Sequence, residues 1–430
     1  MVPILHKKIP LMKVTFLLLL STILLSCTST STFTGFSYDP PGVTDTSNKV
    51  TLEQKKRIIG AGFPKVWVSN EFESARAIDF YHVNEDTFEV IIEPENHPIN
   101  NSPWYGFNIW SDEEREIHLK LRYKEGRHRY VPKLYFASHK DTLKQTINNV
   151  TYEDSTGSSS FKLALKKWPH QISAHFLDGI RFSDLLNERT WIRHSFIHVD
   201  TVGYSHQKRP IIELTVSEAS SITNKGILAL LSRQHPPEVP GYKVYQAFFK
   251  TLISDSELAK TFRKYFVVKA YPIINPDGVV NGHWRHNVGG VDLNRDWINF
   301  NQPETRAVRD ALLRTISQNK DWNMYYGIDF HSTSKNIFYP ILQDIKTFPD
   351  NISQRWFPTI NEANPELRFV SEEFDTTSPI AKNWIYRAFG SDALTFEVYD
   401  ELSPDQIQHL GTSAAQSLME FLIEEWKNQN

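Results

Sequence analysis

The sequence predicts an α/β domain with a mixed, largely parallel sheet flanked by helices, preceded by an antiparallel β-sandwich. Two observations lead to this fold class, namely the chain length and a change in the period of the apolar residues. With 430 residues, the chain has room for two or three domains with substantial cores. Apolar residues recur with a period of two from about 48 to about 178, and strand-like runs alternate with helical spacings from about 179 onward.

The amino terminus predicts export from the cytoplasm. Residues 14–26 form an apolar run of 13 residues that follows Lys13 and ends at Cys27, the only cysteine of the chain. A basic stretch before an apolar run of this length is typical of an export signal, and the run is shorter than the about 20 residues that a membrane-spanning helix needs. Residues 1–27 are therefore predicted to be a signal peptide.

The position of Cys27 resembles the lipobox of bacterial lipoproteins, in which the cysteine becomes the lipidated first residue of the mature chain. The alternative is a free cysteine that lies by chance at the end of an apolar helix. Small polar residues follow, and we expect residues 28–47 to form a flexible tether. The sequence thus predicts an exported protein of the bacterial cell envelope that contacts the membrane only through a lipid anchor.

The next stretch, residues 48–178, is predicted to form the β-sandwich. Its alternation of apolar and polar residues is clearest at 105–109, 116–123 and 161–165, and turn-forming clusters such as 94–98 separate the strands. This half carries no obvious chemistry.

Residues 179–430 are predicted to form the α/β domain. Its expected strands are the apolar runs at 210–216, 226–231, 266–271, 324–330 and 393–398. Between them lie helical spacings, and a last helix is expected to begin at Ser403-Pro404, a capping residue followed by a proline in the first turn. Sites in such domains gather at the carboxyl ends of the strands.

Charge and cysteine content limit the possible ligands. The chain carries 47 basic and 50 acidic side chains, so its formal charge of -3 provides no overall basic field for nucleic acid. A single cysteine excludes an intramolecular disulfide and a zinc site built from cysteines. Any metal must therefore be held by His, Asp or Glu.

Residues at or near predicted strand ends form a candidate metal site with a candidate base beside it. A His-x-x-Glu pair is formed by His235 and Glu238, although 16 histidines give roughly one such pair by chance, and His82 begins another. His235 follows an apolar run, His331 does so too, and Glu397 interrupts another such run. A buried carboxylate has a raised pKa and is suited to accept a proton from water. For each residue alone, a structural histidine or a solvent-facing glutamate on an edge strand remains the alternative.

Five motifs follow one another in the second half of the chain, at residues 233–238, 275–279, 290–297, 329–332 and 395–397. Their order and spacing resemble those of the zinc metallocarboxypeptidases. The His-Pro-x-Glu form of the first motif, the preceding sandwich and the Phe-Glu-Ser segment at 72–74 are most similar to the cytosolic carboxypeptidase branch. The resemblance covers nearly all of the chain after the tether and implies a metallocarboxypeptidase-like fold.

The resemblance also implies a catalytic apparatus. One Zn²⁺ per chain would be held by His235, Glu238 and His331, with a position left open for water. Glu397 would act as the general base and later as the acid. Arg285 would stabilise the oxyanion that forms on the scissile carbonyl.

Further roles follow from the same resemblance. Asn294 and Arg295 would clamp the terminal carboxylate of the substrate. Asp292 would accept a hydrogen bond from the first zinc histidine and fix its tautomer. Lys382 falls at the position that lines the specificity pocket, which predicts a preference for acidic terminal residues, and its alternative is a solvated lysine.

Two positions depart from the family pattern. Pro237 stands where pancreatic members carry an arginine, which the cytosolic branch also lacks. The family's mobile active-site tyrosine falls on Asp375, and no tyrosine is adjacent. We therefore expect another group to make the hydrogen bond to the substrate terminus.

Together these features predict a zinc-dependent carboxypeptidase that hydrolyses C-terminal residues of peptides or proteins in the cell envelope. One alternative keeps the same residues but acts on peptidoglycan stem peptides as a carboxypeptidase or amidase. A second alternative is a catalytically inactive lipoprotein that binds a glycan or protein partner through the sandwich.

Overall fold

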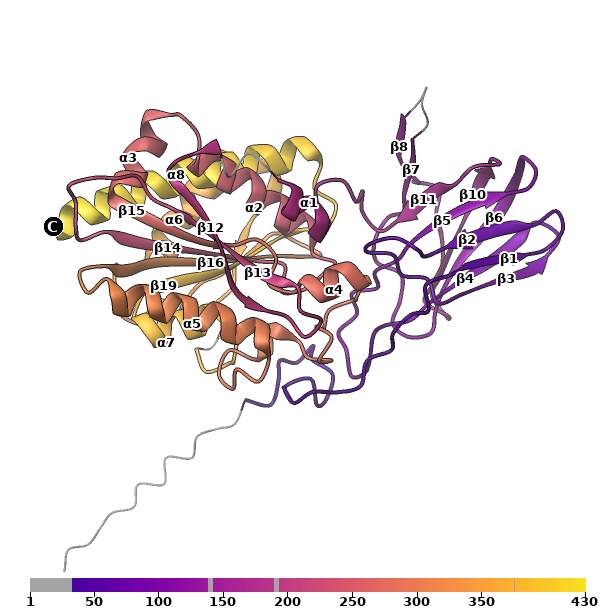
Figure 1. The fold of residues 1–430 in the computed structure, drawn as a ribbon, viewed down its shortest axis with the longest axis horizontal. Helices are drawn as coiled ribbons and strands as arrows, with labels where there is room; N and C mark the ends of the chain where they lie inside the picture. The colour runs from indigo at the N-terminus through magenta and orange to yellow at the C-terminus, as the bar shows by residue number, and fades with distance from the viewer. Residues whose placement is uncertain (1–32, 138–141, 189–192, 375) are drawn as a thin grey trace, which may run out of the picture. The chain divides into compact units, whose positions relative to one another are not determined.

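The computed structural model describes residues 33–137, 142–188, 193–374 and 376–430 (Figure 1). The predicted signal peptide, Cys27 and Asp375 lie outside these residues. The predicted fold class is confirmed, because two smaller sheets precede an eight-stranded mixed sheet with helices on both faces. Among the described residues, no helix has both the length and the apolar character that are needed to cross a membrane.

The first half of the chain forms two sheets. One sheet contains, in spatial order, β1 (Ile58–Ala61), β2 (Val66–Ser69), β5 (Gly106–Ser111), β11 (His170–Ser173), β7 (Lys133–Ala137) and β8 (Thr142–Thr146). The other contains β3 (Asp79–Asn84), β4 (Thr87–Ile92), β6 (Arg115–Tyr123), β10 (Ser158–Leu165) and β9 (Thr151–Glu153).

The period of two predicted for these strands is visible in β6, where Ile117, Leu119 and Leu121 are buried and His118 is exposed. One face of the strand therefore lines the core and the other faces solvent. All pairings in the two sheets are antiparallel except that of β4 with β6, which is parallel.

The second half of the chain contains the eight-stranded sheet. Its spatial order is β12 (Ile197–Tyr204), β13 (Pro210–Val216), β15 (Phe266–Tyr271), β14 (Gly226–Ser232), β16 (Asn323–Thr333), β19 (Asp392–Tyr399), β17 (Ile337–Tyr339) and β18 (Val370–Ser371). The central neighbours β15, β14, β16 and β19 run parallel, whereas β12, β13 and β17 join the sheet through antiparallel pairs. The carboxyl ends of the central strands therefore meet at one edge.

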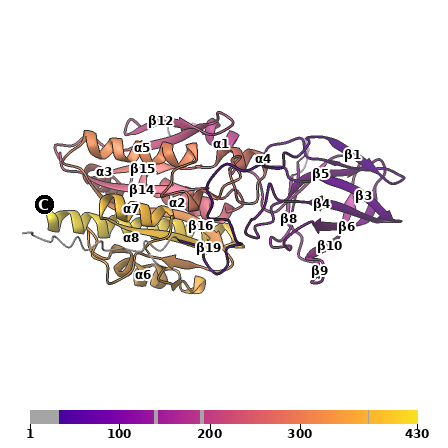
Figure 2. The same cartoon turned by 90° about the horizontal axis from the view of Figure 1, so that it is seen from below.

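Two layers of helices enclose this sheet (Figure 1), and Figure 2 shows the same elements after a quarter turn. Alternate side chains of β14 belong to two separate cores. On one face of the sheet, Leu228 and Leu230 pack with α2 (Val239–Leu252) and α8 (Pro404–Gln429). On the other face, Ile227 and Ala229 pack with α5 (Pro303–Gln318) and α7 (Ala381–Phe389). This explains why β14 is apolar throughout. The remaining helices are α1 (Phe182–Asn187), α3 (Glu257–Tyr265), α4 (Pro276–Asn281) and α6 (Ile352–Ala363).

The predicted start of the last helix is confirmed. The Ser403 side chain accepts a hydrogen bond from the Gln406 backbone N–H, and the Gln406 side chain accepts one from the Ser403 N–H. This reciprocal cap satisfies two of the free donors at the start of α8. Strands β12, β17 and β18 were not predicted, because β12 is mostly exposed and the other two are only three and two residues long.

Residues 33–47 are part of the folded unit that extends to Asn430. The sequence predicts a flexible tether here, but Val43 and Thr46 are buried, and the Thr46 carbonyl accepts a hydrogen bond from the Gln302 side chain at 2.8 Å. This stretch therefore packs against residues of the eight-stranded sheet region rather than extending into solvent.

Candidate metal centre

The three predicted metal ligands come together at the carboxyl edge of the central strands. His235 follows β14, Glu238 is the residue before α2, and His331 lies near the end of the adjacent strand β16. All three are buried, and their ligand atoms lie within 4.8 Å of one another. Gly241 allows this closeness, because a Cβ atom there would lie only 2.4 Å from the His331 carbonyl oxygen.

The orientation of the side chains fits a zinc ion. The Nδ1 atoms of His235 and His331 lie 2.8 and 2.6 Å from the two carboxylate oxygens of Glu238. The Nε2 atoms are engaged elsewhere, with Asp292 at 2.9 Å from His235 and Asp329 at 2.7 Å from His331. Carboxylates on the far nitrogens hold the rings in place, as is usual around zinc histidines. Two imidazoles and one carboxylate are a donor set that zinc accepts.

Asp292 links the metal centre to Arg285. Its Oδ1 contacts His235, and its Oδ2 accepts a hydrogen bond from Arg285 Nε at 2.7 Å. Burial alone would raise the pKa of Asp292, but the charges of Arg285, His235 and Arg295 hold it well below its usual range. The ionised carboxylate thus orients both the imidazole and the guanidinium.

Glu397 lies beside the metal ligands on strand β19, directly opposite His331 in the parallel register. The side chain is half-buried, and its Oε2 atom is buried without a hydrogen-bond partner in the part of the chain that the structure describes. Burial and the negative charge of Glu238 raise the pKa of Glu397 to about 7. The side chain lines the pocket at the metal centre, so the alternative of a solvent-facing glutamate on an edge strand does not fit.

The loop that carries Arg285 is fixed by a residue of the sandwich. The carboxylate of Glu95 accepts hydrogen bonds from three consecutive backbone N–H groups, those of Trp284, Arg285 and His286, at 2.7, 2.9 and 2.6 Å. Glu95 is fully buried. The sequence predicts only a turn around Glu95, because a contact across 190 residues of chain produces no local sequence pattern.

Comparison with known proteins agrees with this arrangement. The zinc carboxypeptidase family model matches residues 186–416, which is more than half of the chain. The chain belongs to the zinc carboxypeptidase family.

Individual relatives match parts of this chain. Cytosolic carboxypeptidase 6 of Mus musculus is 28% identical over 211 residues, which are 47% of this chain and 37% of the relative. Cytosolic carboxypeptidase-like protein 5 of Danio rerio is 39% identical over 170 residues, 38% of this chain and 18% of the relative. The chain thus spans about a third or less of the length of these relatives. In fold it is similar to a metallo-carboxypeptidase from Burkholderia cenocepacia, with a TM-score of 0.68, 15% identity and coverage of 84% of this chain and 99% of that chain.

Asn294 and Arg295 also line the pocket at the metal centre. The Asn294 side-chain oxygen accepts a hydrogen bond from the Ala381 N–H at 2.9 Å, and its Nδ2 lies 3.4 Å from His331 Nε2. Arg295 is buried, and it forms an ion pair with Asp39 of the amino-terminal segment. Asp39 is a site residue that sequence reasoning missed.

The predicted specificity residue lies outside this pocket. Lys382 is fully buried in α7, and its Nζ donates a hydrogen bond to the Pro340 carbonyl oxygen at 2.8 Å. The structure does not bring it together with the other predicted site residues, because the side chain turns into the interior beneath the pocket wall. Ile380, two residues earlier, lines the pocket instead.

Two phenols lie at the pocket of the metal centre. Tyr38 from the amino-terminal segment and Tyr339 from β17 both line the pocket. Tyr38 is more than half exposed, and a phenol is a neutral hydrogen-bond donor at ordinary pH. Neither position follows from local sequence pattern, since Tyr38 precedes the catalytic motifs by almost 200 residues.

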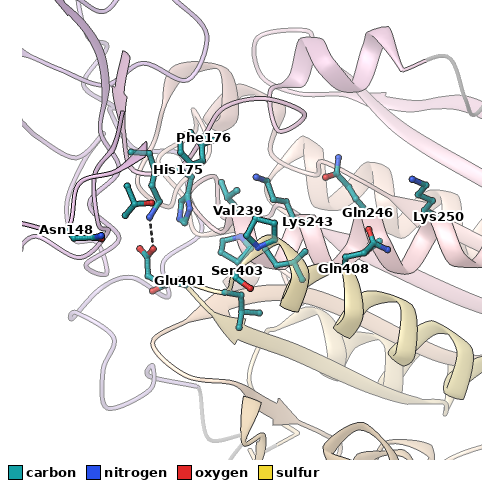
Figure 3. Close-up of a pocket in the computed structure, with 18 residues that line it drawn as sticks. Asn148, His175, Phe176, Val239, Lys243, Gln246, Lys250, Glu401, Ser403 and Gln408 are labelled. Atoms are coloured by element: carbon teal, nitrogen blue, oxygen red, sulfur yellow. Dashed lines mark hydrogen bonds and ion pairs between the residues drawn. The ribbon is translucent and has the colours of Figure 1, made fainter. Parts of the chain in front are cut away.

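A cavity much larger than the pocket at the metal centre lies elsewhere. It has a volume of about 690 Å³ and is lined by sandwich residues such as His175 and by residues of α2 and of the start of α8 (Figure 3). The Lys133–Glu401 ion pair, with 2.7 Å between Nζ and Oε2, lies in its wall. None of the predicted metal ligands lines this cavity, whereas the pocket at the metal centre has a volume of only about 50 Å³.

Proposed function

We propose that this protein is a zinc-dependent metallocarboxypeptidase that removes C-terminal residues from peptides or proteins. The observation that carries the proposal is the convergence of His235, Glu238 and His331 with Glu397 and Arg285 around one pocket. The curated relatives named above are carboxypeptidases, which supports the same activity.

His235, Glu238 and His331 would hold the zinc ion, and Asp292 and Asp329 would orient the two imidazoles. When bound, zinc would supply a Lewis acid that activates water and polarises the scissile carbonyl.

The residues of the chain would then perform the proton transfers and the charge stabilisation. Glu397 is placed to accept a proton from water and later to donate it to the leaving amine, because its pKa lies near neutrality. Arg285, held by Asp292 and by the loop that Glu95 fixes, is placed to stabilise the oxyanion. Asn294 and Arg295 would bind the terminal carboxylate and so direct cleavage to the chain end.

The proposal extends to location. Residues 14–27 support export and lipidation at Cys27, which would present the enzyme to peptides or proteins of the bacterial cell envelope. Peptidoglycan stem peptides, which also end in carboxylates, would be substrates of the same site. The binding-only alternative has less support, because every residue needed for hydrolysis lies at the pocket.

The test is mass spectrometry of a mixed peptide pool after incubation with the zinc-loaded protein. The pool contains each peptide with a free and with an amidated carboxyl terminus. We expect stepwise loss of terminal residues from the free-carboxylate peptides alone, and no loss in the presence of a chelator. Cleavage of amidated peptides at equal rate, or no cleavage with zinc bound, would contradict the proposal, and including peptides with D-residues separates the stem-peptide case.

A further inference from the structure

The amino-terminal segment places a carboxylate on the arginine that is expected to bind the substrate's own carboxylate. Arg295 Nε and Nη2 donate to the two oxygens of Asp39 at 3.0 and 2.8 Å. Only 2% and 1% of the two side chains are exposed. A two-point contact of this kind is the geometry by which guanidinium groups recognise carboxylates.

This contact occupies the edge of Arg295 that Nε and Nη2 form, which is one edge by which a guanidinium binds a carboxylate at two points. Its Nη1 donates to the Asn294 carbonyl oxygen at 2.9 Å. The Phe36 ring covers the guanidinium, with its centre 4.8 Å from the Arg295 Cζ. A terminal carboxylate therefore reaches the Nε–Nη2 edge of Arg295 only after Asp39 has left.

The contacts of the segment divide it into an anchored part and a covering part. Farther along, Thr46 and Asn48 are bonded to Gln302, which anchors the chain to the helical layer. In the covering part, Phe36 packs on Phe374 with 4.8 Å between ring centres, and Asp39 accepts further hydrogen bonds from Asn100 Nδ2 and from the Phe36 N–H. A few contacts thus hold residues 33–39 over the pocket, next to a firmly attached stretch.

We propose that Asp39 determines which substrates the site accepts, because its carboxylate occupies the place of the substrate's terminal carboxylate and must be displaced by it. This inference rests on the proposed function, which assigns Arg295 to that carboxylate. The exchange of one carboxylate for another keeps Arg295 paired throughout, so it avoids leaving a buried charge without a partner. A substrate without a free carboxyl terminus gains nothing that would displace Asp39.

The inference is tested by binding rather than by turnover. In zinc-loaded protein that carries Glu397→Gln, the affinity for a peptide is measured by calorimetry with a free and with an amidated carboxyl terminus. We expect Asp39→Asn to bind the free-carboxylate peptide at least tenfold more tightly, with the affinity for the amidated peptide unchanged. Asp45→Asn is the matched control, because Asp45 lies on the same segment and is exposed, and among the described residues its side chain is bonded only to Ser47 and paired with Lys49.

Equal or weaker binding of the free-carboxylate peptide by Asp39→Asn would overturn the inference. If Asp39→Asn fails to fold, the inference is tested instead by hydrogen exchange of the protein whose only substitution is Glu397→Gln. Peptide binding should speed exchange of residues 36–39, and unchanged or slower exchange would overturn the inference. Turnover separates the two proposals: cleavage of free-carboxylate peptides without tighter binding by Asp39→Asn refutes only this inference, whereas no cleavage by either the natural protein or Asp39→Asn refutes the proposed function.

Discussion

The sandwich buries mainly apolar side chains between its sheets, whereas the eight-stranded sheet gathers charged side chains at the carboxyl ends of its central strands. In the sandwich, the buried charged residues are Arg76, Glu95 and Lys133. Two of these three are bonded to the other half of the chain, Glu95 to the Arg285 loop and Lys133 to Glu401. At the metal centre the buried charges belong mainly to the predicted site residues, whereas in the sandwich two of the three buried charged residues named above contact the other half of the chain.

The Phe-Glu-Ser segment of the sandwich also contacts the other half of the chain. Its Glu73 carboxylate accepts a hydrogen bond from the Ser183 N–H at the start of α1 at 3.2 Å. Its Ser74 hydroxyl donates to the Val279 carbonyl oxygen in α4 at 2.8 Å. The segment that resembles the cytosolic branch in sequence therefore serves as a contact to the catalytic half.

The largest effect should come from exchanging a histidine of the metal centre. For His331→Ala we expect zinc affinity to fall by more than about 100-fold and peptide hydrolysis to be lost, because even a hydrogen-bond partner of a zinc ligand contributes about 10- to 100-fold. Metal analysis after dialysis measures the first effect and peptide turnover the second. The control is His128→Ala, since His128 is buried in the sandwich and contacts Tyr123 and Ser159. Zinc loss in His128→Ala, or zinc retained by His331→Ala, would contradict the assignment of zinc binding to the eight-stranded sheet and not to the sandwich.

A smaller but specific effect is expected at Glu95. Glu95→Gln replaces the acceptor of three backbone N–H groups by a neutral amide, so the Arg285 loop should shift. We expect kcat to fall about tenfold to 100-fold with little change in KM, because small displacements of a catalytic group have effects of this size.

Steady-state kinetics of Glu95→Gln are compared with those of Glu401→Gln. The latter removes the ion pair with Lys133, which is one of the ion pairs that join the two halves. Both variants should lower the free energy of unfolding, and only Glu95→Gln should lower kcat. Equal effects on kcat would show that Glu95 has a structural role alone.

The pH dependence of stability should reveal the apolar character of the sandwich. Burial lowers the pKa of His128 to about 4, so between this value and the ordinary value the unfolded chain binds a proton that the folded chain does not. The free energy of unfolding should therefore fall as the pH is lowered from about 6.5 to 4, by about 3 kcal/mol. Denaturant titrations at several pH values measure this change, and His128→Gln should flatten it. If the free energy of unfolding of His128→Gln depends on pH as steeply as that of the natural protein, the assignment of this pH dependence to His128 is contradicted.

The smallest effect is expected on the solvent face of the sandwich. Lys162 and Glu116 form a cross-strand pair with 3.1 Å between Nζ and Oε1, and about 60% of each side chain is exposed. For Lys162→Ala we expect a loss of less than about 1 kcal/mol, because exposed ion pairs are solvated in either state. A larger loss in a denaturant titration would show that charge on this face is not merely solvated.

The sequence predicts those parts of the site that have a local signal. Apolar runs locate β14, β16 and β19, and the side chains that follow or interrupt them, His235, His331 and Glu397, lie together because parallel strands end at one edge. The metal ligands were therefore predictable.

The remaining site residues have no such signal. Asp39 contacts Arg295 across 256 residues of chain, and its surroundings, Tyr38-Asp39-Pro40-Pro41, have the composition of a loop. Glu95 lies in a cluster of turn-forming residues. For Lys382 the family position suggested a pocket residue, but the packing of α7 turns the side chain into the interior. Long-range contacts and the direction of a side chain depend on tertiary packing, which local patterns do not record.

The most direct test of the central claim measures zinc content and peptide turnover on the same samples of the natural protein and of Glu397→Gln. His235, Glu238 and His331 are proposed to bind zinc, and Glu397 is proposed to transfer the proton. We therefore expect one zinc ion per chain in both proteins and a loss of turnover in Glu397→Gln of about 100-fold to 10,000-fold, the range typical of a general base. Turnover that persists in Glu397→Gln, or zinc that is lost from it, would contradict the account.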